Sequence, residues 1–139
     1  MIIIMKISTK GRYGLRLMIE LALSYPQRLI PLKEIAQSQN ISVKYLEQII
    51  TSLGRHGLVS SVRGAQGGYT LSRPPQEISV RDILSATEEN LTLVGCLEEG
   101  CDRQSCCMAN QVWRQISDVL NQTAAAISLA DIISQSTNK

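Results

Sequence analysis

The sequence predicts a mostly α-helical fold with one small β-hairpin and a long helix near the carboxyl end. The chain of 139 residues has no Phe and only 4% aromatic residues, so its core must be aliphatic, which favours helices. Two short helical patterns flank a tight turn, and alternating polar and apolar residues around a glycine-rich tip follow directly. In this order the elements predict a winged helix-turn-helix, with a β-hairpin wing and a long dimerisation helix.

The first predicted helix begins near residue 8 and ends before Pro26. Ser8 or Thr9 can accept a hydrogen bond from the free N–H groups of the first turn, and Pro26 cannot continue the helix. The apolar residues that recur at helical spacing, and that we expect to face the core, are Leu15, Met18, Ile19, Ala22 and Leu23.

A helix-turn-helix is predicted over residues 31–57. Its first helix spans residues 31–39, with Asn40 just past its end, and its second begins after Ser42 and stops at Gly57. The opposite face of the second helix then presents hydrogen-bonding side chains, as recognition helices do in the major groove of DNA. The expected buried stripe of this helix is Val43, Leu46, Ile49, Ile50 and Leu53.

The wing is predicted between residues 58 and 71. Residues 58–62 and 69–71 alternate between polar and apolar positions on either side of the tip sequence GAQGG. The tip lacks the Walker pattern and no helix opens after it, so nucleotide binding is not expected. Arg63 stands beside the tip in the basic half of the chain, which favours a DNA-contacting wing over a plain turn.

Three further helices are predicted after a stiff RPPQE linker. One is capped by Ser79, one of about five turns contains NQVWRQISDVLNQTAAAI, and a short one lies in SLADIISQS. The long helix has an apolar stripe that a small domain leaves exposed, so we expect it to pair with its own copy in a twofold homodimer. The residues expected in this dimerisation face are Val112, Trp113, Ile116, Val119, Leu120, Thr123 and Ile127.

Charge divides the chain into a basic and an acidic half. Residues 1–75 hold ten Lys and Arg against three Glu, whereas residues 76–139 hold four Lys and Arg against nine Asp and Glu. A basic half suits a polyanion such as nucleic acid, and two solvated surfaces of chance composition are the plainer alternative. The residues expected to contact DNA are Lys10, Arg12, Ser42, Lys44, Tyr45, Glu47, Gln48, Arg63 and Gly64.

Several functional classes are not expected. No run of 18 apolar residues is present, and MIIIMK is too short for a signal peptide, so we expect a cytoplasmic protein without membrane contact. The single His and the lack of a base–nucleophile pair argue against an enzyme and against a small-molecule substrate. Either Met1 or Met5 is compatible with the native start.

Four parts are expected along the chain. Residues 1–5 form an amino-terminal extension, and residues 6–88 form the winged helix-turn-helix domain. Residues 89–108 form a loop that contains all the cysteines, called the cysteine loop below, and residues 109–139 form the dimerisation helix and the carboxyl-terminal helix.

The four cysteines lie in one polar stretch, CLEEGCDRQSCC, at positions 96, 101, 106 and 107. A reducing cytoplasm disfavours a disulfide, and structural zinc normally needs C-x-x-C pairs or a nearby His, which are absent from this stretch. An iron–sulfur cluster tolerates longer spacings because its ligands surround a larger object, so it is favoured over zinc and over a redox dithiol. Adjacent cysteines point apart, so the expected ligands are Cys96, Cys101 and one of Cys106 or Cys107.

The chain resembles the bacterial Rrf2 transcription regulators, and in particular the iron–sulfur-cluster regulators of the IscR type. The resemblance lies in STKGRYGL, YLEQ, GLVSSVRGAQGGY, the cysteine loop and CMANQVWRQISD, and it covers nearly the whole chain from Met5. It implies a dimeric repressor or activator that binds a double-stranded DNA operator, with a cluster near the dimer interface. It also implies that Cys107, six positions before Trp113, is the third ligand and that Cys106 is an extra thiol.

Two positions depart from the pattern of these regulators. The IscR type carries a His three residues after the third cysteine as the fourth ligand, and Asn110 stands there in this chain. The nitric-oxide-sensing relatives use an acidic residue of the first helix, and the matching position holds Arg12. The fourth ligand therefore stays open among Cys106, a group from the other subunit and an exogenous thiol. A 2Fe–2S cluster is favoured, with a 4Fe–4S cluster as the alternative.

The expected function is transcriptional regulation that senses iron–sulfur cluster status, redox state or nitric oxide through a cluster held by three cysteines. The alternative is a cysteine-metabolism-type regulator, or a thiol or zinc redox regulator, that has no cluster and acts partly through a protein partner. A related cysteine-metabolism repressor shares the DNA-binding half but lacks the cysteine loop.

Overall fold

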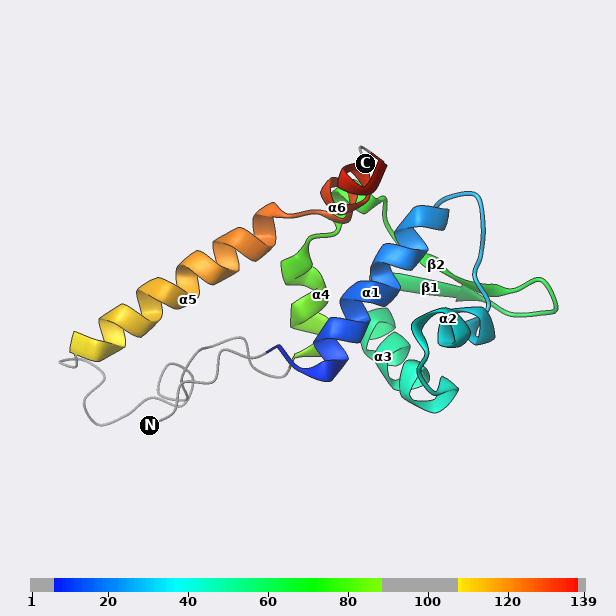
Figure 1. Ribbon diagram of the computed structural model, residues 1–139, viewed down its shortest axis with the longest axis horizontal. Coiled ribbons are helices and arrows are strands. Elements are labelled where there is room, and N and C mark those ends of the chain that lie inside the picture. Colours follow the sequence, from blue (N-terminus) through cyan, green and yellow to red (C-terminus); the bar gives the residue numbers. More distant parts are fainter. Residues whose placement is uncertain (1–6, 89–107, 138–139) are drawn as a thin grey trace.

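The computed structural model describes residues 7–88 and 108–137 of the chain. Within these ranges the protein consists of six α-helices, one short 3-10 helix and a two-stranded antiparallel hairpin (Figure 1). The predicted mostly helical fold with a hairpin wing is confirmed. In chain order the elements are α1 (Thr9–Ser24), α2 (Leu32–Gln39), α3 (Val43–Arg55), β1 (Val59–Val62), β2 (Gly68–Leu71), η1 (Pro75–Glu77), α4 (Val80–Thr87), α5 (Met108–Ala126) and α6 (Leu129–Thr137).

The helix ends follow the residue types that the sequence places there. Ser8, Ser42 and Ser79 each accept a hydrogen bond through the side chain from a backbone N–H of the first turn of the helix that follows. Asn40, after α2, and Gly57, after α3, adopt left-handed backbone conformations with φ of 55° and 72°. These caps confirm the predicted bounds of the helix-turn-helix.

The core is aliphatic, and the predicted stripe of α1 is right in part, since Met18 and Ala22 are buried. The deepest core residues of α1 include Leu17 and Leu21, which the predicted stripe omitted. Leu23 is 60% exposed, and Leu15 and Ile19 are only partly buried. Apolar residues surround most of α1, so helical spacing alone identified only part of the face that packs on α3, α4 and α6.

The recognition helix α3 matches the prediction except at its start. Leu46, Ile49, Ile50 and Leu53 are buried, whereas Val43 is 39% exposed. Val43 lies in the first turn of α3, one turn before the buried stripe begins at Leu46. Val43 and Lys44, in the amino-terminal turn of α3, therefore project beyond the core.

The wing is attached to the helix-turn-helix by backbone hydrogen bonds. β1 and β2 pair antiparallel, with Val59 opposite Leu71 and Val62 opposite Gly68. Ile30 exchanges two backbone hydrogen bonds with Tyr69, at 3.0 and 2.9 Å, directly before α2 begins. This pairing fixes the position of β2 relative to α2, so the wing and the helix-turn-helix form one unit.

The carboxyl-terminal helix returns to the core, while α5 projects away from it (Figure 1). The Val80 N–H donates to the Ile127 carbonyl and the Leu129 N–H donates to the Ile78 carbonyl, both at 2.9 Å. Leu129, at the start of α6, is fully buried. The carboxyl end of α5 is therefore anchored to the domain. Among the described residues, no helix is long and apolar enough to cross a membrane.

Candidate nucleic-acid interface and dimerisation face

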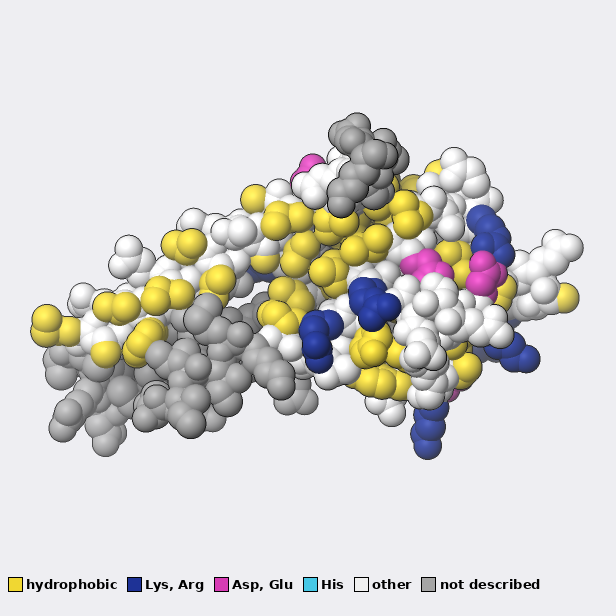
Figure 2. Space-filling view, in the orientation of Figure 1, with side chains coloured by type: hydrophobic (Ala, Val, Ile, Leu, Met, Phe, Trp, Pro, Cys, Tyr) yellow, Lys and Arg dark blue, Asp and Glu magenta, His cyan; other side chains and the backbone are white. Residues whose placement is uncertain are grey.

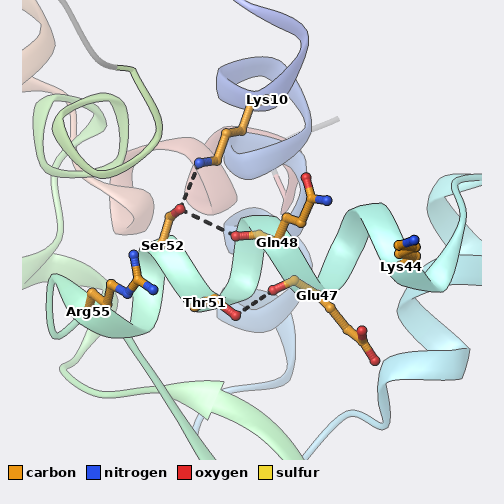
Figure 3. Close-up of a pocket in the computed structure, with 7 residues that line it drawn as sticks. All are labelled: Lys10, Lys44, Glu47, Gln48, Thr51, Ser52 and Arg55. Atoms are coloured by element: carbon orange, nitrogen blue, oxygen red, sulfur yellow. Dashed lines mark hydrogen bonds between the residues drawn. The ribbon is translucent and has the colours of Figure 1, made fainter.

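A shallow groove runs along the outer side of α3, and α1 contributes to one wall (Figure 3). Four predicted DNA-binding residues meet there, three of them from the recognition helix. Ser52 and Arg55 lie on the outward face expected from the sequence, although they were not among the residues expected to contact DNA. Thr51, four positions after Glu47, was not expected on this face. The lining residues are Lys10, Lys44, Glu47, Gln48, Thr51, Ser52 and Arg55.

Lys10 joins the first helix to the recognition helix. Its Nζ donates a hydrogen bond of 2.7 Å to Ser52 Oγ, although the two residues are 42 positions apart. The Ser52 hydroxyl in turn donates to the backbone carbonyl of Gln48 at 3.3 Å. Figure 3 shows Lys10 and Gln48 pointing to the same side of α3, whereas Glu47 points away from both. The positive charge of Lys10 is thereby held over the exposed face of α3.

The electrostatics of the groove favour an anion. Lys10, Lys44 and Arg55 bring three positive charges to its lining, and Glu47 brings one negative charge. The Glu47 side chain is exposed, so a ligand in the groove can contact it directly. Such a surface attracts phosphates and still holds one acceptor-only group that can discriminate among bases.

Two predicted residues of the recognition helix have structural partners. The Ser42 hydroxyl is occupied by the cap contact with the Tyr45 N–H, at 3.1 Å. The Tyr45 ring packs edge-on against Tyr13, with ring centroids 6.2 Å apart, and the Arg16 guanidinium lies 5.2 Å from the centre of the Tyr13 ring. Tyr45 is thereby half-buried and held by α1. Ser42 and Tyr45 orient the exposed first turn of α3.

The other predicted DNA-binding residues lie apart from the groove. Arg12 is exposed on α1 and donates to Thr9 Oγ1 at 3.1 Å. Arg63 and Gly64 are exposed at the tip of the wing, where Gly64 adopts φ of 117°. A side chain at Gly64 would be strained at this backbone angle, which explains the glycine. Arg12, Arg63 and Gly64 are therefore exposed but do not line the groove.

The projecting helix α5 carries an exposed apolar stripe. Figure 2 shows hydrophobic side chains along α5, while most of the Lys and Arg side chains visible in this view lie over the middle and the opposite end of the molecule. Val119 is 55% exposed, and Trp113 alone of the predicted dimerisation residues is half-buried. Near its carboxyl end the stripe opens into an apolar cavity of about 330 Å³ between α5, α4 and the start of α1, lined by Ile7, Val80, Arg81, Leu84, Leu120, Asn121, Thr123, Ala124 and Ile127.

A second side of α5 is polar and buried. Asn110 is 3% exposed and Ser117, two turns later, is 6% exposed. Among the described residues, Asn110 Nδ2 and Ser117 Oγ have no hydrogen-bond partner. A buried donor without a partner is costly, so these atoms mark places where a further contact is expected. Cys96, Cys101, Cys106 and Cys107 lie outside the described residues, as do residues 1–5.

Comparison with known proteins identifies the family. A family model described as "Rrf2: Iron-dependent Transcriptional regulator" matches residues 7–135. The chain belongs to the Rrf2 family. As an Rrf2 member it is a transcriptional regulator and not an enzyme.

Named Rrf2 relatives cover almost the whole chain. The HTH-type transcriptional regulator IscR of Photorhabdus laumondii is 37% identical over 130 residues, which are 93% of this chain and 79% of the relative. CymR, the global cysteine regulator of B. subtilis, has a TM-score of 0.79 at 39% identity and covers 95% of this chain and 98% of its own. IscR of T. potens has a TM-score of 0.77 at 38% identity, with coverages of 95% and 88%.

The fold is equally similar to the two kinds of Rrf2 regulator. The TM-scores to CymR and to IscR differ by only 0.02, so the backbone does not separate them. The distinction must come from side chains, above all from the cysteine loop and from the residues that meet it.

Proposed function

We propose that this Rrf2 regulator binds a double-stranded DNA operator as a homodimer, and that an iron–sulfur cluster held by the cysteine loop controls the binding. The observation that carries the DNA part is the groove on α3, where Lys10 of α1 lies over an exposed recognition surface. The observation that carries the cluster part is the gathering of all four cysteines in one stretch of a chain whose family is described as iron-dependent.

The groove assigns different tasks to its residues. Lys10, Lys44 and Arg55 neutralise backbone phosphates, which supplies affinity and its dependence on salt. Gln48 and Glu47 face outward from the middle of α3, within reach of base edges in a major groove. The Glu47 carboxylate repels phosphates but accepts a hydrogen bond from cytosine N4, so it contributes selectivity rather than affinity. Arg63 enters the adjacent minor groove from the wing.

The exposed stripe of α5 supports the dimer. A helix that leaves Val112, Val119 and Leu120 largely exposed gains free energy when a second copy covers them. The apolar cavity at the carboxyl end of α5 extends this surface onto α4. A twofold pairing along α5 places two recognition helices on one operator, with a separation that the dimer fixes.

The chemistry of the residues fits a cluster. Cys96, Cys101 and Cys107 are the thiolates that would hold it, with a 2Fe–2S cluster favoured over a 4Fe–4S cluster. Asn110, three positions after Cys107, is buried, and its Nδ2 has no hydrogen-bond partner within residues 7–88 and 108–137. The amide N–H of Asn110 is suited to donate a hydrogen bond to a cluster sulfur rather than to ligate iron. We therefore expect another group to be the fourth ligand, and Cys106 is a candidate. A bound cluster would supply a group that responds to iron supply, oxidants and nitric oxide.

A regulator without a cluster is the second candidate. CymR structures are as similar to the chain as the IscR structure, and one of them is an oxidised form of Staphylococcus aureus CymR, at 42% identity and a TM-score of 0.74. In that case the adjacent thiols of Cys106 and Cys107 would act as a redox or zinc group, and part of the regulation would pass through a protein partner.

Anaerobic purification followed by iron and sulfide analysis, with an absorption spectrum, distinguishes the two candidates. The cluster proposal predicts iron and sulfide in equal amounts, lost in Cys96→Ala. In Cys106→Ala the cluster is retained if this thiol is extra and is lost or weakened if this thiol is the fourth ligand. Zinc alone, or no metal under anaerobic conditions, would support the regulator without a cluster.

A further inference from the structure

Glu88 connects the chain that enters the cysteine loop to the start of the DNA-binding domain. It caps the carboxyl end of α4 and is the residue directly before the cysteine loop. Its Oε1 accepts hydrogen bonds from the Ser8 N–H at 3.0 Å and from the Ser8 hydroxyl at 2.6 Å. Ser8 is the residue that caps α1, 80 positions earlier. The first turn of α1 contains no acidic residue, so Glu88 brings the carboxylate that the positive end of this helix favours.

Two glycines of α1 make room for the end of α4, including Glu88. Gly11 and Gly14 are buried, and a glycine in a helix interior costs about 1 kcal/mol relative to alanine. A Cβ at Gly11 would collide with the Glu88 carboxylate, and a Cβ at Gly14 would lie 2.8 Å from Thr87 Cγ2. The glycines therefore allow the end of α4 to lie directly against the first turns of α1.

The same turn of α1 reaches the DNA groove. Lys10 follows the cap residue Ser8 by two positions and donates to Ser52 Oγ on α3 at 2.7 Å. A continuous series of contacts thus leads from Glu88 to Ser8, through one helical turn to Lys10, and on to Ser52 of the recognition helix. Release of Ser8 removes the carboxylate from the first turn of α1, and the position of Lys10 depends on that turn.

We propose that Glu88 is a positioning residue that couples the cysteine loop to the DNA groove. While its carboxylate holds Ser8, the first turn of α1 is ordered and Lys10 stays over α3. Because Glu88 directly precedes the cysteine loop in the chain, a change in the loop would displace Glu88 and weaken its hold on Ser8. The position of Lys10 would then change as well. This inference rests on the proposed cluster-controlled function and names the residues that transmit the control.

The test measures how strongly DNA binding responds to the cluster in Glu88 variants. The probe is a DNA duplex enriched from a random-sequence pool by the wild-type protein. Its dissociation constant is measured anaerobically for cluster-loaded and cluster-free protein, and the ratio of the two constants is the response. We expect a wild-type response in the usual range for allosteric coupling, roughly 5- to 150-fold. In Glu88→Ala the response should fall to within about twofold of unity, because the coupling contact is absent.

Three further variants make the result specific. Glu88→Gln keeps an oxygen that accepts from Ser8, so it should restore most of the response. Glu77→Ala removes an exposed acid of η1 and should leave the response unchanged. Ser8→Gly deletes the hydroxyl donor but keeps an acceptable cap residue, so it should weaken the response and serves if Glu88→Ala does not fold.

Hydrogen exchange gives a readout that does not depend on the cluster. In cluster-free protein, Glu88→Ala should speed amide exchange at residues 9–12 while the buried turns of α3 stay protected. An unchanged DNA response in Glu88→Ala and Ser8→Gly would overturn the coupling role of Glu88. A wild-type protein that binds the duplex equally with and without the cluster would instead overturn the proposed function, so the two failures are distinct.

Discussion

At the scale of single residues, the structure gives reasons for types that look unfavourable in the sequence. Gly11 and Gly14 lie inside a helix where alanine is normally better, yet each faces the end of α4 with no room for a methyl group. Lysine is normally a mobile surface residue, but the Lys10 ammonium is held by a hydrogen bond to Ser52 of another helix. Both features depend on partners far away in the sequence.

Gly14→Ala and Gly54→Ala should change stability in opposite directions. A Cβ at Gly14 meets Thr87 Cγ2 at 2.8 Å, so we expect Gly14→Ala to lower the free energy of unfolding by about 1–3 kcal/mol through overpacking. Gly54 is exposed on α3 and a Cβ there would meet only the Val59 carbonyl, at an ordinary 3.7 Å. Gly54→Ala should stabilise by about 0.5–1 kcal/mol. Urea unfolding checks both, and a stabilising Gly14→Ala would contradict the packing of α1 on α4.

Lys10→Ala should weaken binding to all DNA sequences by a similar factor. Each lost phosphate contact makes the negative slope of log affinity against log salt shallower by about 0.9. The control is Arg73→Ala, which removes an equal charge from an exposed residue outside the groove. Fluorescence anisotropy over a salt series measures the slope. Equal slopes for the wild type and Lys10→Ala would show that Lys10 makes no phosphate contact.

At the scale of elements, local sequence signals account for the caps, the turn and the hairpin. Ser8, Ser42 and Ser79 begin helices, and Asn40 and Gly57 end them, because their side chains or backbone freedom act within a few residues. The face that each helix buries depends on neighbours from elsewhere in the chain. Periodicity therefore identified most of the buried face of α3, which has one apolar side, but only Met18 and Ala22 of the buried face of α1, which is apolar on several sides.

The dimerisation role of α5 is tested by charge on its exposed stripe. Leu120→Asp places a carboxylate in the middle of the surface that a second copy would cover, so a dimer should shift toward monomer because the charge must be desolvated. Gln122→Asp adds the same charge on the polar side of α5, where it stays in water. Light scattering coupled to gel filtration gives the mass. A Leu120→Asp protein with the mass of the wild type would show that this face is not the interface.

At the scale of the whole molecule, the sequence predicts the DNA-binding half better than the link between its parts. The winged helix-turn-helix could be predicted from the helix caps, the glycines and the alternation of polar and apolar residues over 58–71, because these signals involve residues close together in the chain. The return of α6 into the core and the contact of Glu88 with Ser8 could not be predicted, because they join residues about 50 to 80 positions apart. The Lys10–Ser52 contact escaped prediction for the same reason.

Cluster control of DNA binding is tested by comparing the same protein in two states. The wild type is prepared anaerobically with its cluster and then without it, and both forms are titrated against the same enriched DNA duplex at several salt concentrations. If the cluster controls binding, the dissociation constants of the two forms should differ by at least about fivefold, with a steep salt dependence in the tighter form. Equal affinities of the two forms at every salt concentration would contradict cluster-controlled DNA binding.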